Sequence, residues 1–112
     1  MAVLNIYKFY GKTVTAAETN TLLSPGVAET FLVKSLRITN KSGSNTPTIT
    51  IKDNAFEIVN TQTLTAATSV ELLTLPLIIE GGTTLTAITA GTVTDGVVIG
   101  ISYLNIKKEI TT

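Results

Sequence analysis

Eight acidic side chains are the groups in this sequence that could do chemistry, because paired carboxylates can act as the acid and the base or nucleophile of glycoside hydrolysis. Their positions do not indicate such a pair. Asp53 and Asp95 fall in segments typical of turns, and Glu80 precedes a Gly-Gly turn, where acids are solvated or bind their own backbone. We therefore expect no enzymatic activity from this set, which comprises Glu18, Glu29, Asp53, Glu57, Glu71, Glu80, Asp95 and Glu109.

Histidine and cysteine are both absent from the sequence. Without them a Ser-His-Asp triad, a thiolate nucleophile and the usual nitrogen or sulfur ligands of zinc are excluded. The sequence also has no Asp-x-Asp-x-Asp run for calcium and no glycine-rich phosphate loop. It therefore predicts no metal and no cofactor.

Charge and hydropathy patterns argue against nucleic-acid and membrane binding. Arg37 is the only arginine, and the seven lysines are scattered rather than gathered in a stripe that could follow a phosphate backbone. The longest mostly apolar run, 72–79, is too short to span a bilayer and is interrupted by Thr74 and Pro76. Because the first residues lack the basic and apolar regions of a secretory signal, we expect synthesis in the cytoplasm of a host cell.

Threonine occupies 22 of the 112 positions. It is β-branched, favours strands and presents a hydroxyl to water. Charged residues make up 14% of the chain against a typical value of about 25%, and the net charge is zero. Many small β domains are rich in threonine, but a neutral surface with few charges also repels its own copies only weakly. This composition favours a protein that works in an assembly, as a homo-oligomer.

Short segments rich in Val, Ile, Leu and Thr alternate with turn signals along the chain. The alternation is clearest in 48–52, 84–87 and 97–104, with isoleucine predicted to face inward and threonine outward. Segment 97–104 is apolar on both faces, which indicates a central strand or a strand whose outer face meets another subunit. We predict an all-β protein: a single antiparallel β-sandwich over 1–112, jelly-roll-like or Ig-like, with about seven to nine strands.

Three segments leave alternatives open. In 30–39 the apolar side chains change parity, so we expect a β-bulge at Lys34 and Ser35; the alternative is a straight strand buried on both faces. Segment 68–75 resembles a capped helix ended by Pro76, but 70–75 also fits a strand, which its strand-forming neighbours favour. The first 20 residues could form a first strand or an arm that packs on a partner, and both roles need the same residues.

Four motifs follow one another in the order of a known group of proteins. They are Leu22–Ala28 with a Ser-Pro-Gly turn, Val33–Gly43 ending in Asn-Lys-Ser-Gly, Thr48–Ile51, and Leu77–Leu85 with a Glu-Gly-Gly turn. This order resembles the small β-sandwich virion proteins of tailed bacteriophages and covers residues 21–106. The resemblance implies a non-catalytic role as a decoration, head-to-tail, fibre or tail component of a virion, in symmetric copies.

The resulting hypothesis is a virion structural protein that contacts copies of itself and other virion proteins. Apolar side chains left over after one small core is filled would make these contacts, and the sequence predicts Tyr7, Phe9, Tyr10, Val98 and Leu104 for this role. The alternative is a carbohydrate- or receptor-binding module on the same sandwich. Such modules normally expose several aromatic rings, and six aromatic residues with no tryptophan weigh against that alternative.

Overall fold

The computed structural model describes residues 3–108, and within that range every regular element is a β-strand. Glu109 and the first two residues of the predicted N-terminal segment lie outside the described residues. The strands are β1 (Val3–Val14), β2 (Thr19–Leu23), β3 (Glu29–Asn40), β4 (Thr48–Asp53), β5 (Phe56–Thr63), β6 (Thr68–Glu71), β7 (Leu77–Ile79), β8 (Leu85–Ala90) and β9 (Val97–Lys108).

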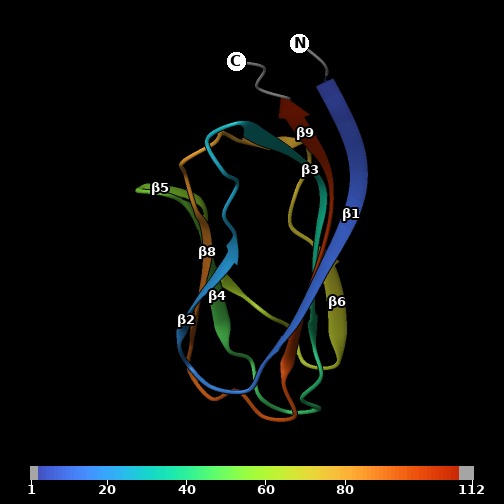
Figure 1. Cartoon of the computed structure of the whole chain (residues 1–112). Coiled ribbons are helices and arrows are strands. Elements are labelled where there is room, and N and C mark those ends of the chain that lie inside the picture. Colours follow the sequence, from blue (N-terminus) through green and yellow to red (C-terminus); the bar gives the residue numbers. More distant parts are fainter. Residues whose placement is uncertain (1–2, 109–112) are drawn as a thin grey trace.

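The strands form two antiparallel sheets that pack face to face, which confirms the predicted β-sandwich (Figure 1). Sheet A has the order β1-β9-β3-β6, with β7 also paired to β3, and sheet B has the order β2-β8-β4-β5. The strand pairs are nested: β1 with β9, β2 with β8, β3 with β6 and β7, and β4 with β5. One long hairpin rolled up gives this pattern, so the sandwich is of the jelly-roll type.

Alternating side chains from both sheets fill one core. Ile49 and Ile51 of β4 and Leu85 and Ala87 of β8 are fully buried, as their alternation with threonine predicted. Burial of each large aliphatic side chain contributes about 1.5 to 3 kcal/mol. The fully buried apolar side chains are Val14, Val33, Leu36, Ile38, Ile49, Ile51, Leu64, Ile79, Leu85, Ala87, Val97, Ile99 and Ile101.

The rule that threonine faces outward is wrong at Thr89. This residue is buried, because its hydroxyl binds the loop between β1 and β2. The Thr89 Oγ1 donates to the carbonyl oxygen of Ala16 at 2.8 Å and accepts from the N–H of Glu18 at 3.1 Å. The neighbouring Ile88 is consequently on the outer face of sheet B, half-exposed.

Two bulges bring apolar side chains of opposite parity to the core. The register of β3 on β9 shifts between Val33 and Ser35, which confirms the bulge predicted at Lys34 and Ser35. As a result Phe31 and Val33 before the shift face the core together with Leu36 and Ile38 after it. A second bulge in β2, between Thr21 and Leu23, allows two consecutive leucines to be buried.

Of the strand predicted over 70–75 in place of a helix, only Val70 and Glu71 lie in a strand, β6, and 68–76 forms no helix. Strand β6 ends at Glu71, and 72–76 is a loop that leads to β7. The carboxylate of Glu71 accepts hydrogen bonds from the N–H groups of Leu36 and Leu73, at 2.7 and 3.3 Å. These contacts turn the chain away from β3 before it resumes pairing at Leu77.

The loop after β3 is held by a buried asparagine. The Nδ2 of Asn40 donates to the carbonyl oxygens of Asn45 and Leu64, at 2.9 and 3.2 Å, and its Oδ1 accepts from the N–H of Ser42 at 3.1 Å. The Oγ of Ser42 in turn accepts from the N–H of Asn45 at 2.9 Å. The Asn-Lys-Ser-Gly motif therefore has a structural purpose, since it closes one end of the sandwich.

Two glycine-containing turns meet elsewhere in the fold. The N–H of Gly82 donates to the carbonyl oxygen of Pro25 at 3.1 Å. The backbones approach so closely that a β-carbon on Gly81 would lie 2.9 Å from the carbonyl oxygens of Val27 and Glu29. Glycine at position 81 therefore permits the Ser-Pro-Gly and Glu-Gly-Gly turns to pack together.

Candidate interaction surface

Four apolar side chains form a line across the outer face of sheet A. The strand register places Tyr7 opposite Leu104, Leu104 opposite Leu32, and Leu32 opposite Ile78. Tyr7 is 72% exposed and Ile78 is 58% exposed, and the two leucines between them are half-buried. We call these four residues the apolar row; it crosses β1, β9, β3 and β7.

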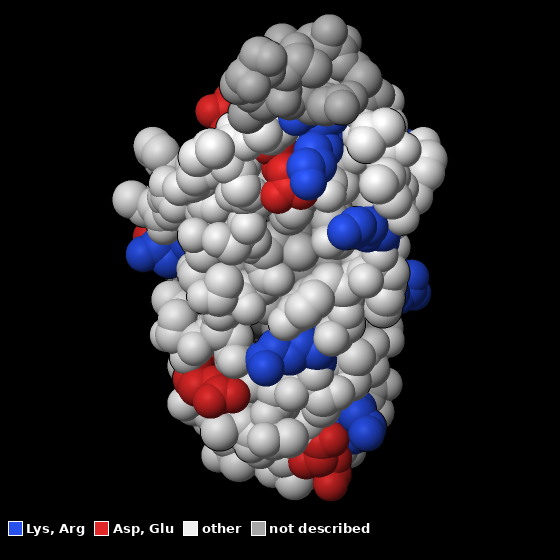
Figure 2. Space-filling model, in the orientation of Figure 1, with Lys and Arg blue, Asp and Glu red and all other residues white. Residues whose placement is uncertain are grey.

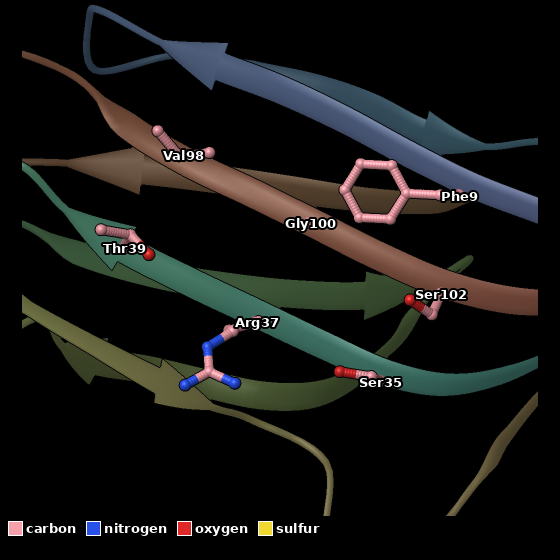
Figure 3. Close-up of a pocket in the computed structure, with 7 residues that line it drawn as sticks. All are labelled: Phe9, Ser35, Arg37, Thr39, Val98, Gly100 and Ser102. Carbon is pink, nitrogen blue, oxygen red and sulfur yellow. The ribbon is translucent and has the colours of Figure 1, made fainter.

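A shallow depression of about 330 Å³ lies beside the apolar row on the same face. Phe9, which is 70% exposed, projects from β1 toward Gly100 on β9 (Figure 3). A β-carbon on Gly100 would lie 3.3 Å from this ring, and one on Gly11 would lie 3.0 Å from it, so both glycines admit the ring. The residues that line the depression are Phe9, Ser35, Arg37, Thr39, Val98, Gly100 and Ser102.

The bulge in β3 positions the polar groups of this face. It turns Lys34 outward, and the Lys34 Nζ lies 5.1 Å from the centroid of the Tyr7 ring, a distance typical of a cation–π contact. Ser35 donates a hydrogen bond to the carboxylate of Glu71. Partial burial raises the pKa of Glu71, but hydrogen bonds from Ser35, Leu36 and Leu73 and the charge of Arg37 outweigh it, so that the pKa lies below its ordinary value.

A second carboxylate with a lowered pKa holds the start of β3. The Glu29 Oε1 accepts from the N–H of Gly26, and its Oε2 accepts from the Nδ2 of Asn105, both at 2.9 Å. The hydrogen bond from Gly26 is the main cause of the lowered pKa of Glu29. Burial, together with the charge of Glu29, raises the pKa of the nearby Tyr103. Both shifted carboxylates thus bind groups of the fold itself.

The structure does not bring the acidic residues together in a metal-binding cluster. Within residues 3–108 no three acidic side chains are close enough to hold a metal ion. Over the same residues, no helix has the length and hydropathy needed to cross a membrane.

Four of the five side chains predicted as subunit contacts share the outer face of sheet A. Tyr7 and Leu104 belong to the apolar row, and Phe9 and Val98 line the depression. Tyr10 alternates to the opposite face of β1, where it packs against the core. The role of all five in subunit contacts stays a prediction.

Sequence reasoning missed the two members of the row that complete it, Leu32 and Ile78. The alternation in 30–33 places Leu32 opposite in parity to the buried Phe31 and Val33, which is a signal that was available. For Ile78 the sequence offers only a run of three apolar residues, Leu77 to Ile79. Its outward direction follows from pairing with β3, which lies far away in the sequence.

The outer face of sheet B has a different character. The register places Thr21 opposite Thr86, and both Thr19 and Thr50 opposite Ile88. Threonine hydroxyls therefore dominate this face, whereas apolar side chains dominate part of the outer face of sheet A. In the view of Figure 2, charged residues are few and are separated by broad uncharged areas.

No family model and no curated protein matches this sequence. Among solved structures, one of infectious bursal disease virus, Gx strain, is similar over 98% of this chain, with 14% sequence identity and a TM-score of 0.45. This chain spans 37% of the length of that protein. A functional assignment must therefore come from the surfaces of this chain.

Proposed function

We propose that this protein is a non-catalytic structural component of a virion, and specifically of a tailed bacteriophage, where it would serve in capsid decoration, at the head-to-tail junction or as a tail accessory protein. It acts by associating with copies of itself and with other virion proteins. The observation that carries this proposal is the apolar row on the outer face of sheet A, with Phe9 exposed beside it.

The physical basis of this association is burial of apolar surface. Contiguous apolar patches are uncommon on monomeric proteins and usually mark an interaction site. Each square ångström of apolar surface removed from water contributes about 25 cal/mol, and the zero net charge of the chain adds no overall repulsion between copies. Jelly rolls occur both in viral capsids and in lectins, so the surface rather than the fold distinguishes these functions.

A carbohydrate- or receptor-binding module is the second candidate, and the depression beside Phe9 favours it. The depression combines one aromatic ring with the guanidinium of Arg37 and the hydroxyls of Ser35 and Ser102. These groups could stack on a sugar ring and bind its hydroxyls. The depression contains a single aromatic ring, however, and in the apolar row beside it only the hydroxyl of Tyr7 could hydrogen-bond a sugar.

The proposal is tested by removing the exposed ends of the apolar row. We expect the wild-type chain to form oligomers in size-exclusion chromatography with light scattering, and the double variant Tyr7→Thr/Ile78→Thr to shift strongly toward monomer. Threonine is a good strand former, so the fold should be retained. Val27→Thr is the matched control, because Val27 is 91% exposed but lies in a turn outside this face.

Two further observations separate the candidates. Mass spectrometry of purified phage particles from cells that carry the gene should detect the chain at a fixed copy number, and its gene should lie beside capsid and portal genes. A wild-type chain that is monomeric at millimolar concentration, absent from particles and bound specifically by one glycan on an array would overturn the proposal in favour of the binding module.

A further inference from the structure

The two sheets have four open edges, and three of them carry features that discourage a further strand from pairing. Strand β5 has two register shifts against β4, and β2 has only five residues and one shift. The edge opposite β1 in sheet A is divided between β6, with four residues, and β7, with three. Bulges and short, interrupted strands are the usual means by which monomeric β proteins protect their edges.

The fourth edge, β1, lacks these features. Its 12 residues pair with β9 without a register shift, from Val3 opposite Lys108 to Val14 opposite Val97. Among the strands of residues 3–108, only β9 pairs with it, and Figure 1 shows it along the outer side of the molecule. About half of the backbone N–H and C=O groups of β1 therefore point away from the sheet.

Apolar side chains accompany this open edge on both faces of the strand. Tyr7 and Phe9 are exposed on the outer face, and Leu4 and Ile6 are about half exposed on the inner face. A paired strand would cover these side chains as well as satisfy the backbone groups.

The charges of β1 define which strand would fit. Lys8 and Lys12 lie opposite the core residues Tyr103 and Ile99, so both lysines are on the inner face, four residues apart. Lysine on the inner face of an edge strand opposes pairing with an apolar strand, because the ammonium group would lose its water. The charge of Lys8 contributes to the lowered pKa of Glu29. Glu29 is nevertheless not a dedicated partner of Lys8, because both its carboxylate oxygens already accept hydrogen bonds from other groups.

A second copy of the chain does not supply the required charges. Pairing of β1 with another β1 would place no carboxylate opposite Lys8 or Lys12, because β1 contains no acidic residue. Glu57 lies opposite Lys52, on the outer face of sheet B, and Glu71 lies opposite Arg37, on the outer face of sheet A. None of the open edges in residues 3–108 presents carboxylates on its inner face at the spacing of Lys8 and Lys12.

We propose that the open edge of β1 binds an extended strand of a different protein, and that this strand carries two acidic residues four positions apart, which face Lys8 and Lys12. The proposed function supplies the source of that strand, another virion protein. Strand binding itself depends only on the edge and its two lysines.

The probe is a set of synthetic 12-residue peptides of alternating valine and threonine, the same length as β1. One peptide carries two glutamates four residues apart, on one face; a second carries them three apart, on opposite faces; a third carries lysines four apart. We expect the first to bind about threefold more tightly than the second, which keeps one of the two charge pairs, and about tenfold more tightly than the third, since each cross-strand charge pair changes affinity by about 1.4- to 5-fold. Amide hydrogen exchange should then show new protection at alternate residues of β1.

Charge reversal provides the control. The variant Lys8→Glu/Lys12→Glu should prefer the lysine peptide, whereas Lys41→Glu/Lys52→Glu, with the same net charge, should keep the wild-type preference. Equal binding of all peptides, or protection away from β1, would overturn the proposal. Protection of β1 in the chain alone as its concentration rises would also overturn it, because the occupant would then be a second copy.

The experiments separate this proposal from the proposed function. If the glutamate peptide fails to bind while Tyr7→Thr/Ile78→Thr still abolishes assembly, the edge proposal is wrong and the structural function stands. If the glutamate peptide binds but the chain neither assembles nor occurs in particles, the edge proposal stands and the proposed structural function is wrong.

Discussion

Single residues fix this fold where backbones approach one another. Gly81 has no room for a side chain because three carbonyl oxygens, including those of Val27 and Glu29, lie against the position that a β-carbon would occupy. Gly100 performs a different task, since it admits the ring of Phe9 on the outer face. Two glycines thus serve packing rather than turn formation, one between two loops and one beneath an aromatic ring.

Gly81→Ala should lower the free energy of unfolding by about 1 to 3 kcal/mol, because the two turns must separate to accept the methyl group. Urea denaturation would measure this loss. Gly43→Ala is the matched control, since a β-carbon there would meet no atom within 4 Å, and it should change stability by about 0.5 kcal/mol or less. Equal effects of the two substitutions would contradict a packing role for Gly81.

At the scale of elements, the bulge in β3 is held by a side chain from the neighbouring strand. The N–H of Leu36, next to the bulge, faces the gap between the end of β6 and the start of β7, and the Glu71 carboxylate accepts from it. The same carboxylate accepts from Ser35, which lies on the outer face beside the depression. Glu71 therefore couples the geometry of the bulge to the shape of the candidate surface.

Stability should consequently depend on pH through Glu71. Its pKa lies below the ordinary value of 4.5, so the unfolded chain binds the proton more tightly, and the stabilisation is present above 4.5 and lost as the pH falls through the lowered pKa. At neutral pH, Glu71→Gln should lower the free energy of unfolding by about 1 kcal/mol. As the pH falls through the lowered pKa of Glu71, the variant and the wild type should converge.

Urea denaturation across this pH range would measure the difference. Glu57→Gln, on the exposed strand β5, is the control and should follow the wild-type curve. Glu29 has a lowered pKa as well, so part of the acid dependence should remain in Glu71→Gln. An unchanged acid dependence in that variant would show that Glu71 does not hold the bulge.

The bulge in β3 could be predicted from the sequence, whereas the bulge in β2 and the apolar row could not. The parity change in 30–39, with a polar pair at the break, sufficed to predict the shift at Lys34 and Ser35, because the core accepts only one face of a strand. The β2 bulge left no comparable signal, since two adjacent leucines fit several structures. The apolar row could not be assembled from sequence at all, because its four members come from strands whose pairing is set by the whole fold.

At the scale of the whole molecule, the two outer faces differ in the side chains that they expose. Threonine hydroxyls on sheet B remain compatible with water, and the apolar row on sheet A is suited to contact with another protein. The chain carries no net charge, so the proposed contact between copies would not depend on long-range attraction.

Association through the apolar row should therefore vary little with ionic strength. Between about 0.05 and 0.5 M salt we expect the oligomer fraction to stay constant or rise slightly, because screening does not weaken apolar burial. Light scattering at fixed protein concentration would measure this. Over the same range of salt concentration, binding of the glutamate peptide at β1 should weaken several-fold. If the oligomer fraction falls as much as the peptide affinity, the copies associate by charge rather than by apolar burial.

The nested pairing of strands determines how late β1 can find its partner while the chain is being synthesised. Among the strands of residues 3–108, β1 is made first but pairs only with β9, so it must wait until strands β2 to β9 have left the ribosome, a delay on the order of seconds. During that time neither edge of the β1 segment is paired, and Lys8 and Lys12 oppose aggregation of this otherwise mostly apolar segment. Lys8 and Lys12, the two charges proposed to select a partner strand for the mature protein, thus also protect the nascent chain from aggregation.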